Sequence, residues 1–219
     1  FRSMNLFKGG SGGSTTTEEN GAVSLYQALK NEGYSINDNV YNALKNSTVK
    51  RSRGFIGEVG KDFYDDGMKS SFSQYDDVAL ITLGRYSGEQ QDFASNGDAN
   101  QDNGADENGD PIDNQGVRML SLHQEERETI ELAKSSGFKK IVVLLNTATT
   151  MEVGELESLG VDACLWIGYP GYTGFEGVAK VLKGEYDPSG RTVDTYATNS
   201  LSSPAMRNFG SFNYSNVTD

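Results

Sequence analysis

The chain has 219 residues, 36% hydrophobic and 23% charged, so it is long enough and apolar enough to bury a sizeable core. Its formal net charge of −12 disfavours nucleic acid and anionic membranes as partners, because both are negatively charged. No run approaches the roughly 20 apolar residues of a membrane-spanning helix, and no signal peptide is visible. We therefore expect a soluble protein, either cytoplasmic or secreted.

The single cysteine and the single histidine exclude several kinds of site. Cys164 alone can build neither a disulfide framework nor a metal cluster, and its apolar neighbours predict a buried strand thiol. Any Ser-His-Asp triad would depend on His123, whose place at a helix start predicts a capping or surface residue instead.

Two helices are predicted in the first part of the chain. Residues 1–20 are loop-like and rich in glycine, but no Gly-Lys-Ser/Thr sequence makes them a phosphate-binding loop. Apolar residues at helical spacing predict a helix from about 22 to 29 that ends near Gly33. A second apolar stripe predicts a helix over 36–44, whereas residues 50–73 fit neither a helix nor a strand pattern.

Three continuous apolar runs, at 77–83, 140–146 and 163–168, predict strands that are buried on both faces. Helical segments lie between the second and third runs and after the third, and another precedes the second run. Ser121 with Gln124 reads as the capping box of that preceding helix. Doubly buried strands that alternate with helices predict an α/β fold, a three-layer α/β/α sandwich with a mostly parallel central sheet.

Residues 94–116, "ASNGDANQDNGADENGDPIDNQG", differ in kind from the rest of the chain because they contain almost nothing apolar. Their alternating Asp and Asn residues are reminiscent of calcium loops. Glycine is nevertheless missing from the sixth position, and no Glu closes a twelve-residue loop. The composition favours a solvated, mobile loop insertion over a calcium site.

Ligands of parallel α/β sheets gather beyond the carboxyl ends of the strands. Glu89 lies just past such an end, on a loop that glycines flank, in the sequence "LITLGRYSGEQQDF". The Gly-rich loop "GYPGYTG" lies past another. Taken by itself, a carboxylate on such a loop is usually only a solvated side chain.

Three sequence segments, in their order along the chain, resemble the pattern of one protein family. The first is "GRYSGEQQDF" after a strand, the second is "SLHQEERETIELAKSSGFKKIVVLLNTATTMEV", and the third is "DACLWIGYPGYTGFEGVAKVLKGEYDPSGRTVDTY". This order resembles the α/β sandwich domain of glycoside hydrolase family 3, the β-glucosidases and their relatives. The resemblance extends from about Gly12 to Tyr196, and the PG-x-x-G loop with the later PSGR turn is its most specific part.

The resemblance implies a division of labour between two domains. In that family a (β/α)8 barrel supplies a nucleophilic Asp, and the sandwich domain supplies the acid/base Glu in an R-x-SGE-G-x-D-like motif. Glu89 occupies the acid/base place in "RYSGEQQD". Gln90 and Phe93 replace a Gly and an Arg that are frequent in the family, changes that concern loop shape and substrate contacts. No cofactor and no metal are implied.

Other residues near these motifs have candidate roles. Arg85 and Tyr169 are predicted to bind substrate, although Arg85 could instead pair with Asp92 or with a backbone carbonyl. Asp92 is expected to brace the loop. Trp166 could stack on a sugar as Tyr169 could, but its apolar strand favours a place in the core.

We assign residues 1–200 to the sandwich domain of a family 3-like glycosidase and residues 201–219 to a tail or linker. The expected partners are a β-linked oligosaccharide or glycoside and a (β/α)8 barrel of the same enzyme, which no stretch of this chain provides. A non-catalytic module that binds carbohydrate or stabilises a partner is the alternative. A flavodoxin-like nucleotide binder also fits the alternation of elements but lacks a phosphate loop.

Overall fold

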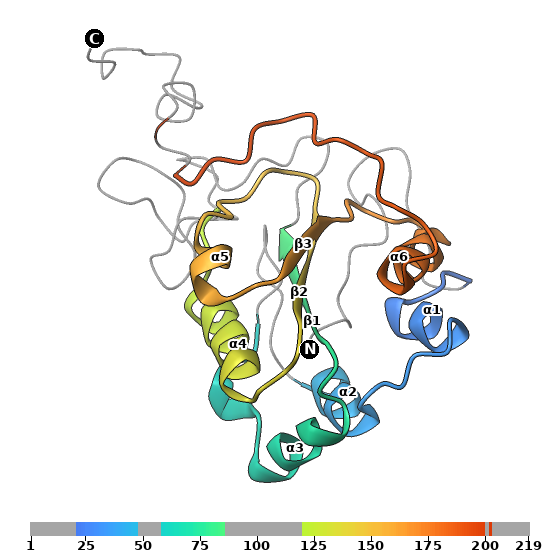
Figure 1. Cartoon of the computed structure of the whole chain (residues 1–219), viewed down its shortest axis with the longest axis vertical. Helices are drawn as coiled ribbons and strands as arrows, with labels where there is room; N and C mark the ends of the chain where they lie inside the picture. Colours follow the sequence, from blue (N-terminus) through green and yellow to red (C-terminus); the bar gives the residue numbers. More distant parts are fainter. Residues whose placement is uncertain (1–20, 48–57, 86–119, 200–201, 203–219) are drawn as a thin grey trace, which may run out of the picture.

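The computed structural model describes residues 21–47, 58–85, 120–199 and 202. Within these residues, β1 (Ala79–Arg85), β2 (Ile141–Thr147) and β3 (Ala163–Trp166) form a parallel sheet in the order β1-β2-β3 (Figure 1). The register pairs Ala79 with Ile141 and Arg85 with Thr147. All three strands therefore end at one edge of the sheet.

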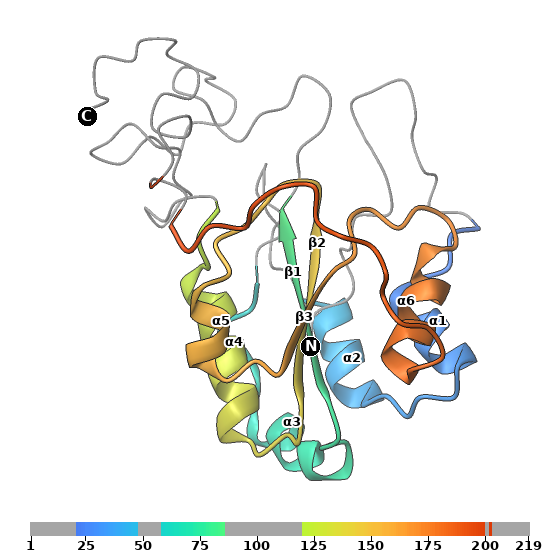
Figure 2. The same cartoon turned by 45° about the horizontal axis from the view of Figure 1, so that its top comes forward.

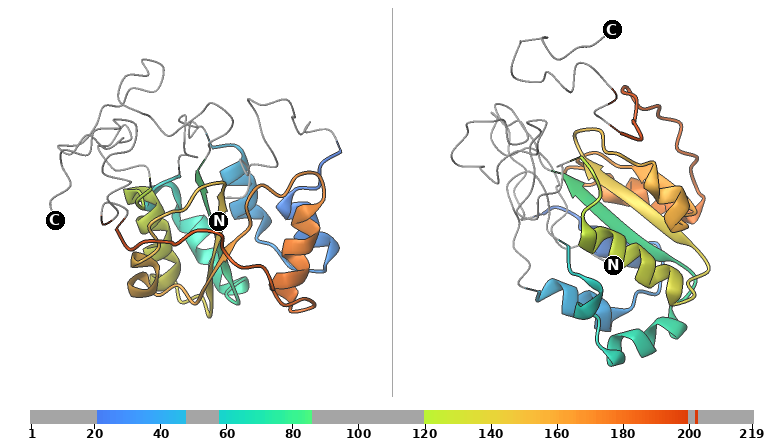
Figure 3. Two further views of the ribbon diagram at one scale, coloured as in Figure 1. Left: turned by 90° about the horizontal axis from the view of Figure 1, so that it is seen from above. Right: turned by 90° about the vertical axis from the view of Figure 1, so that its left-hand side faces the viewer.

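Helices cover both faces of this sheet. On one face lie α4 (Gln124–Ser135) and α5 (Glu155–Leu159), and on the other lie α1 (Leu25–Asn31) and α6 (Gly174–Lys183) (Figure 2). The view from above shows the same three layers (Figure 3). This arrangement confirms the predicted three-layer α/β/α sandwich with a parallel sheet. The remaining described elements are α2 (Asp38–Lys45), α3 (Asp66–Ser71) and the short 3-10 turns η1 (Lys61–Phe63) and η2 (Phe72–Gln74).

Side chains alternate between the two faces of each strand, so the sheet has a hydrophobic core on each side. The core under α4 and α5 contains Ala79, Ile81, Leu83, Leu122, Ile130, Ala133, Ile141, Val143, Leu145, Met151 and Leu156. The core under α1 and α6 contains Leu25, Ala28, Leu144, Phe175 and Ala179. A third cluster joins α2 and α3 through Val40, Leu44, Val59, Tyr64, Met68 and Phe72. Each fully buried large aliphatic side chain contributes roughly 1.5–3 kcal/mol.

The first two helices confirm the sequence prediction to within a few residues. Ser24 precedes α1 and its hydroxyl accepts from the Gln27 N–H, while Asn37 caps α2 in the same way. Gly33 follows α1 with φ of +86°, a left-handed conformation that glycine adopts without strain. The ambiguous region 50–73 contains η1 and α3 in its described part.

The predicted capping box of α4 is wrong by two residues. His123 is the residue before the helix, and the Glu126 carboxylate accepts from the His123 backbone N–H at 2.9 Å. Ser121 instead donates its hydroxyl to Glu152 Oε2 at 2.8 Å. His123 is buried, so the capping expectation is confirmed and the surface expectation is wrong. In this shifted box the same Glu126 carboxylate also binds Arg85 of the neighbouring strand.

The prediction of full burial holds for β1 and β2 but is wrong for β3. Ala163, Cys164 and Trp166 are exposed, and Leu165 is partly buried. Strand order alone does not explain this, because β1 is also an outer strand of the described sheet and is buried. The difference is helix cover: α4 lies against β1 and β2, whereas among the described residues of β3 only Leu165 packs against a core cluster, as a partly buried residue. An apolar run indicates a strand but does not say which helices cover that strand.

The segment after α6 returns across the molecule to the α4–α5 side (Figure 2). Tyr196 packs against the core under α4 and α5. Thr198 lies against Gly154, where an added Cβ would come within 2.9 Å of the Thr198 methyl carbon. Because Gly154 has no side chain, Thr198 can pack directly against its backbone, and any larger residue at position 154 would push Thr198 away. Among the described helices, none is both long and apolar enough to cross a membrane.

Candidate functional site

The edge at which the three strands end is the candidate site, because ligands of parallel α/β sheets bind beyond the carboxyl ends. Arg85 is the last residue of β1 and Thr147 the last of β2. Glu89 follows Arg85 by four residues in the sequence. Glu89 lies outside the described residues, as do Asp92 and the acidic insertion 94–116.

Arg85 makes a dense set of contacts at this edge. Its Nη1 donates to Glu126 Oε1 at 2.7 Å and its Nη2 donates to Glu126 Oε2 at 2.9 Å, which is a two-pronged ion pair. The same guanidinium donates to the Ser121 carbonyl at 2.7 Å and to the Gly84 carbonyl at 3.0 Å. The side chains of Arg85 and Glu126 are 0% and 2% exposed. The pair ties the end of β1 to the first turn of α4.

The charge state of Glu126 follows from its surroundings. Burial favours the neutral acid, but the Arg85 charge and hydrogen bonds, with a smaller contribution from His123, outweigh it and hold the pKa of Glu126 below its ordinary value of 4.5. Glu126 is therefore ionised at neutral pH and faces a permanently charged guanidinium. Sequence reasoning missed this residue, although its place three residues after the helix start is the N3 position of a capping box.

Tyr169 lies at the same edge and contacts β1 directly. Its hydroxyl donates to the Arg85 carbonyl at 3.2 Å. Asn146, fully buried near the end of β2, donates from Nδ2 to the Gly168 carbonyl at 2.7 Å. The Gly-rich loop is thus fastened to two strands at once. The structure brings the two predicted substrate-binding residues together, while their contact with substrate stays a prediction.

Trp166 departs from the prediction that it belongs to the core. The residue is 44% exposed, and its indole Nε1 donates to the Thr147 carbonyl at 2.8 Å. Cys164, two residues earlier, is also exposed rather than buried. The Cys164 thiol is nevertheless partly shielded from water, and this desolvation raises its pKa to about 11.

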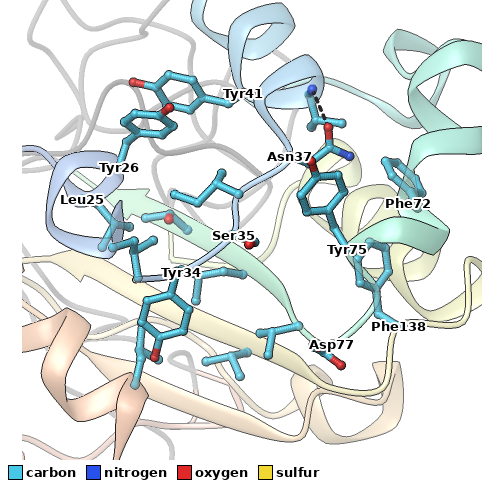
Figure 4. Close-up of a pocket in the computed structure, with 18 of the residues that line it drawn as sticks. Leu25, Tyr26, Tyr34, Ser35, Asn37, Tyr41, Phe72, Tyr75, Asp77 and Phe138 are labelled. Carbon is cyan, nitrogen blue, oxygen red and sulfur yellow. Dashed lines mark hydrogen bonds between the residues drawn. The ribbon is translucent and has the colours of Figure 1, made fainter. Parts of the chain in front are cut away.

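A separate cavity of about 500 Å³ lies between α1, α2 and the sheet. Figure 4 shows its wall, in which Tyr26 and Tyr41 stack with ring centroids 3.9 Å apart. The sheet contributes Leu80 and Thr82 from β1 and Val142 from β2, which lie away from the carboxyl ends. Among the described residues, neither Arg85 nor Tyr169, the two predicted substrate-binding residues, lines this cavity, so the strand-end edge remains the candidate site.

The sequence of this chain also matches the model of a known protein family. The model of the "Glycosyl hydrolase family 3 C-terminal domain" matches residues 5–216, which is nearly the whole chain. The chain belongs to glycosyl hydrolase family 3. The match confirms the family that the three sequence segments indicated.

Curated relatives of this family 3 domain include glycosidases. A beta-glucosidase of Ruminococcus albus is 23% identical over 213 residues, which cover 94% of this chain and 20% of the relative. A probable beta-D-xylosidase 6 of Arabidopsis thaliana is 26% identical over 88 residues, 40% of this chain and 11% of the relative. The chain thus spans 20% of the length of the Ruminococcus albus relative.

Solved structures show the same fold. A beta-glucosidase from Paenibacillus barengoltzii superposes with a TM-score of 0.72 at 20% identity, over 95% of this chain and 22% of that structure. A beta-glucosidase from Listeria innocua in complex with isofagomine gives a TM-score of 0.51 at 19% identity, over 83% of this chain and 20% of that structure. Both likenesses concern the fold of the family 3 domain.

Proposed function

We propose that this family 3 domain supplies the general acid/base of a retaining β-glycosidase, and that Glu89 is that residue. The nucleophilic carboxylate belongs to a (β/α)8 barrel of the same enzyme, outside this chain. The observation that carries the proposal is the family match over residues 5–216, together with the "RYSGEQQD" motif that begins at the last residue of β1. The names of the relatives favour a β-glucoside as the substrate.

The proposed reaction has two steps, and Glu89 acts as the acid in the first and as the base in the second. In the first, the nucleophile attacks the anomeric carbon, the glycosidic bond breaks, and Glu89 gives its proton to the departing oxygen. In the second, water attacks the glycosyl-enzyme and Glu89 takes a proton from that water, which restores the acid. Two carboxyl groups about 5–5.5 Å apart suffice, and they can come from different domains.

The described residues contribute by positioning. Arg85 immediately precedes the motif loop, and its ion pair with Glu126 fixes the point from which that loop departs. Tyr169 binds the carbonyl of the same residue. We therefore propose that Arg85 positions the loop, because hydrogen bonds to Glu126, Ser121 and Gly84 already occupy its guanidinium. Direct contact of Tyr169 with the sugar remains part of the proposal.

Glu89→Gln in the longer enzyme tests the assignment. Hydrolysis of an alkyl β-glucoside, which needs a proton on its departing oxygen, should fall roughly 10²–10⁴-fold. An aryl glucoside with an acidic phenol should form the glycosyl-enzyme far more readily, since that leaving group needs little protonation. Glu157→Gln, an exposed carboxylate on α5, is the matched control and should change neither rate.

The alternative of a non-catalytic module predicts a different outcome. In that case Glu89→Gln leaves hydrolysis of both glucosides near the wild-type rate. That result would remove Glu89 from the reaction and leave the domain a binding or stabilising part.

A further inference from the structure

Trp166 is an exposed aromatic residue that the structure holds in one place. Its Nε1 donates to the Thr147 carbonyl at 2.8 Å, and 44% of the residue faces solvent. A Cβ added at Gly168 would lie 3.4 Å from Cζ2 of the indole, so the six-membered ring rests beside that glycine. The ring is fixed at two points before any ligand arrives, which lowers the entropy cost of binding.

The register places this indole at the candidate site. Trp166 pairs with Leu145 of β2, yet its side chain reaches Thr147, two residues nearer the carboxyl end. Thr147 pairs in turn with Arg85 on β1. The indole N–H therefore contacts the end of β2, and the end of β1 is the next strand end along the sheet, about 4.8 Å from that of β2.

We propose that Trp166 is a stacking platform for the leaving group of the substrate, specifically for an aryl or pyranose ring attached to the departing oxygen. This inference rests on the proposed function. The domain that carries the acid must face the glycosidic oxygen, and the leaving group lies on that side of the scissile bond. A fixed indole with an open surface suits a flat ring, because aromatic rings stack favourably and carry large apolar area.

The first experiment uses the fact that Trp166 is the single tryptophan of the chain. Intrinsic fluorescence of the 219-residue chain therefore reports on this residue alone. We expect emission typical of a solvent-exposed indole and efficient quenching by acrylamide. Blue-shifted emission with resistance to acrylamide would show a shielded ring and would overturn the proposal.

The second experiment measures leaving-group preference in the longer enzyme. Trp166→Ala should lower kcat/KM for phenyl β-glucoside roughly three- to tenfold, as expected for the loss of one aromatic stack, and leave ethyl β-glucoside within about twofold. Trp166→Phe keeps a flat ring without the indole N–H and should recover most of the phenyl preference. Tyr186→Ala removes an aromatic residue that is 61% exposed at the other end of α6 and should alter neither substrate.

The outcomes separate the two proposals. An equal loss on both glucosides in Trp166→Ala, or no loss on either, overturns the platform while the Glu89 assignment stands. Unchanged hydrolysis in Glu89→Gln overturns the proposed function itself. If Trp166→Ala does not fold, Trp166→Leu takes its place, because leucine keeps apolar bulk without a flat ring; an unchanged phenyl-to-ethyl ratio in that variant overturns the platform.

Discussion

Arg85 and Glu126 form an ion pair in the interior, joined by two hydrogen bonds of 2.7 and 2.9 Å. Arg85 is the last residue of β1, and Glu126 lies in the first turn of α4. Each charge is satisfied by the other, so the pair is tolerable only while both members are present. The end of β1 therefore depends on a residue 41 positions away in sequence.

Glu126→Gln should strongly destabilise the domain. The amide keeps the shape but leaves the Arg85 guanidinium buried without a counter-charge, so we expect a loss of roughly 3–5 kcal/mol in the free energy of unfolding. Urea denaturation measures this. Glu155→Gln breaks a surface ion pair in which the Arg127 side chain is 32% exposed and that of Glu155 is 50% exposed. This change should lower the free energy of unfolding by under about 1 kcal/mol. Equal losses in the two variants would contradict the buried-pair account.

The same pair predicts a pH dependence. Because the folded-state pKa of Glu126 is lowered from 4.5, the unfolded chain binds the proton more readily, and stability falls as pH drops below about 4.5 toward the folded value. The stability gap between wild type and Glu126→Gln should be full at pH 7 and shrink in that acid range. Other carboxylates with lowered pKa titrate in both proteins and cancel in the difference. A gap that stays constant with pH would contradict the assignment.

Cys164 should react slowly with iodoacetamide although the residue is exposed. Its pKa is raised to about 11, and only the thiolate attacks. At pH 9 about half of the thiols in the unfolded chain are ionised, against about one in a hundred in the folded chain, so alkylation should be roughly 50-fold slower when folded. Mass spectrometry of the modified chain, with and without urea, measures the ratio. Similar rates in both states would show a normal thiol.

The purified 219-residue chain should not hydrolyse aryl β-glucosides. The proposal places the nucleophile on another domain, and an acid/base alone cannot form the glycosyl-enzyme. Release of a chromogenic phenol measures this activity. Turnover that co-purifies with the chain and persists through several columns would show that a complete active site resides within it.

Azide should partly rescue Glu89→Gln in the longer enzyme. Azide attacks the glycosyl-enzyme without needing a general base, so it replaces the water that Glu89 would activate. We expect faster turnover of an activated aryl glucoside and formation of glucosyl azide, seen by mass spectrometry. Asp92→Asn should show no such rescue, since its expected role is to brace the loop. Rescue of both variants alike would assign the base function to more than one carboxylate.

The helices and strands that form the layers could be predicted, because each follows from a hydrophobic pattern within its own segment. The apolar runs of β1 and β2 and the stripes of α1 and α2 indicate their structure within a few residues. The exposure of Trp166 could not be predicted this way. It depends on which helices pack against β3 and not on the four residues in the strand, because β1 is also an outer strand of the described sheet and is nevertheless buried.

The candidate site was predictable in its location but not in its partners. The motif placed Arg85 at the end of a strand, as the structure shows. Its pairing with Glu126 was missed because the two residues come from different elements, and only the packing of α4 on β1 brings them together. Of the two partners expected for Arg85, the backbone carbonyl is confirmed by the hydrogen bonds to Gly84 and Ser121, while Asp92 lies outside the described residues.

The close contact of Thr198 with Gly154 fixes where the chain lies after it has passed α6. That point is beside α5, toward the edge where the strands end (Figure 2). The described chain therefore ends this crossing beside the start of α5, on the α4–α5 face of the sheet and not beside α6. A domain joined further along the chain would be tethered from this anchored point, and its effective concentration there would depend on the length and stiffness of the linking segment, so two halves of an active site could meet without a strong interface of their own.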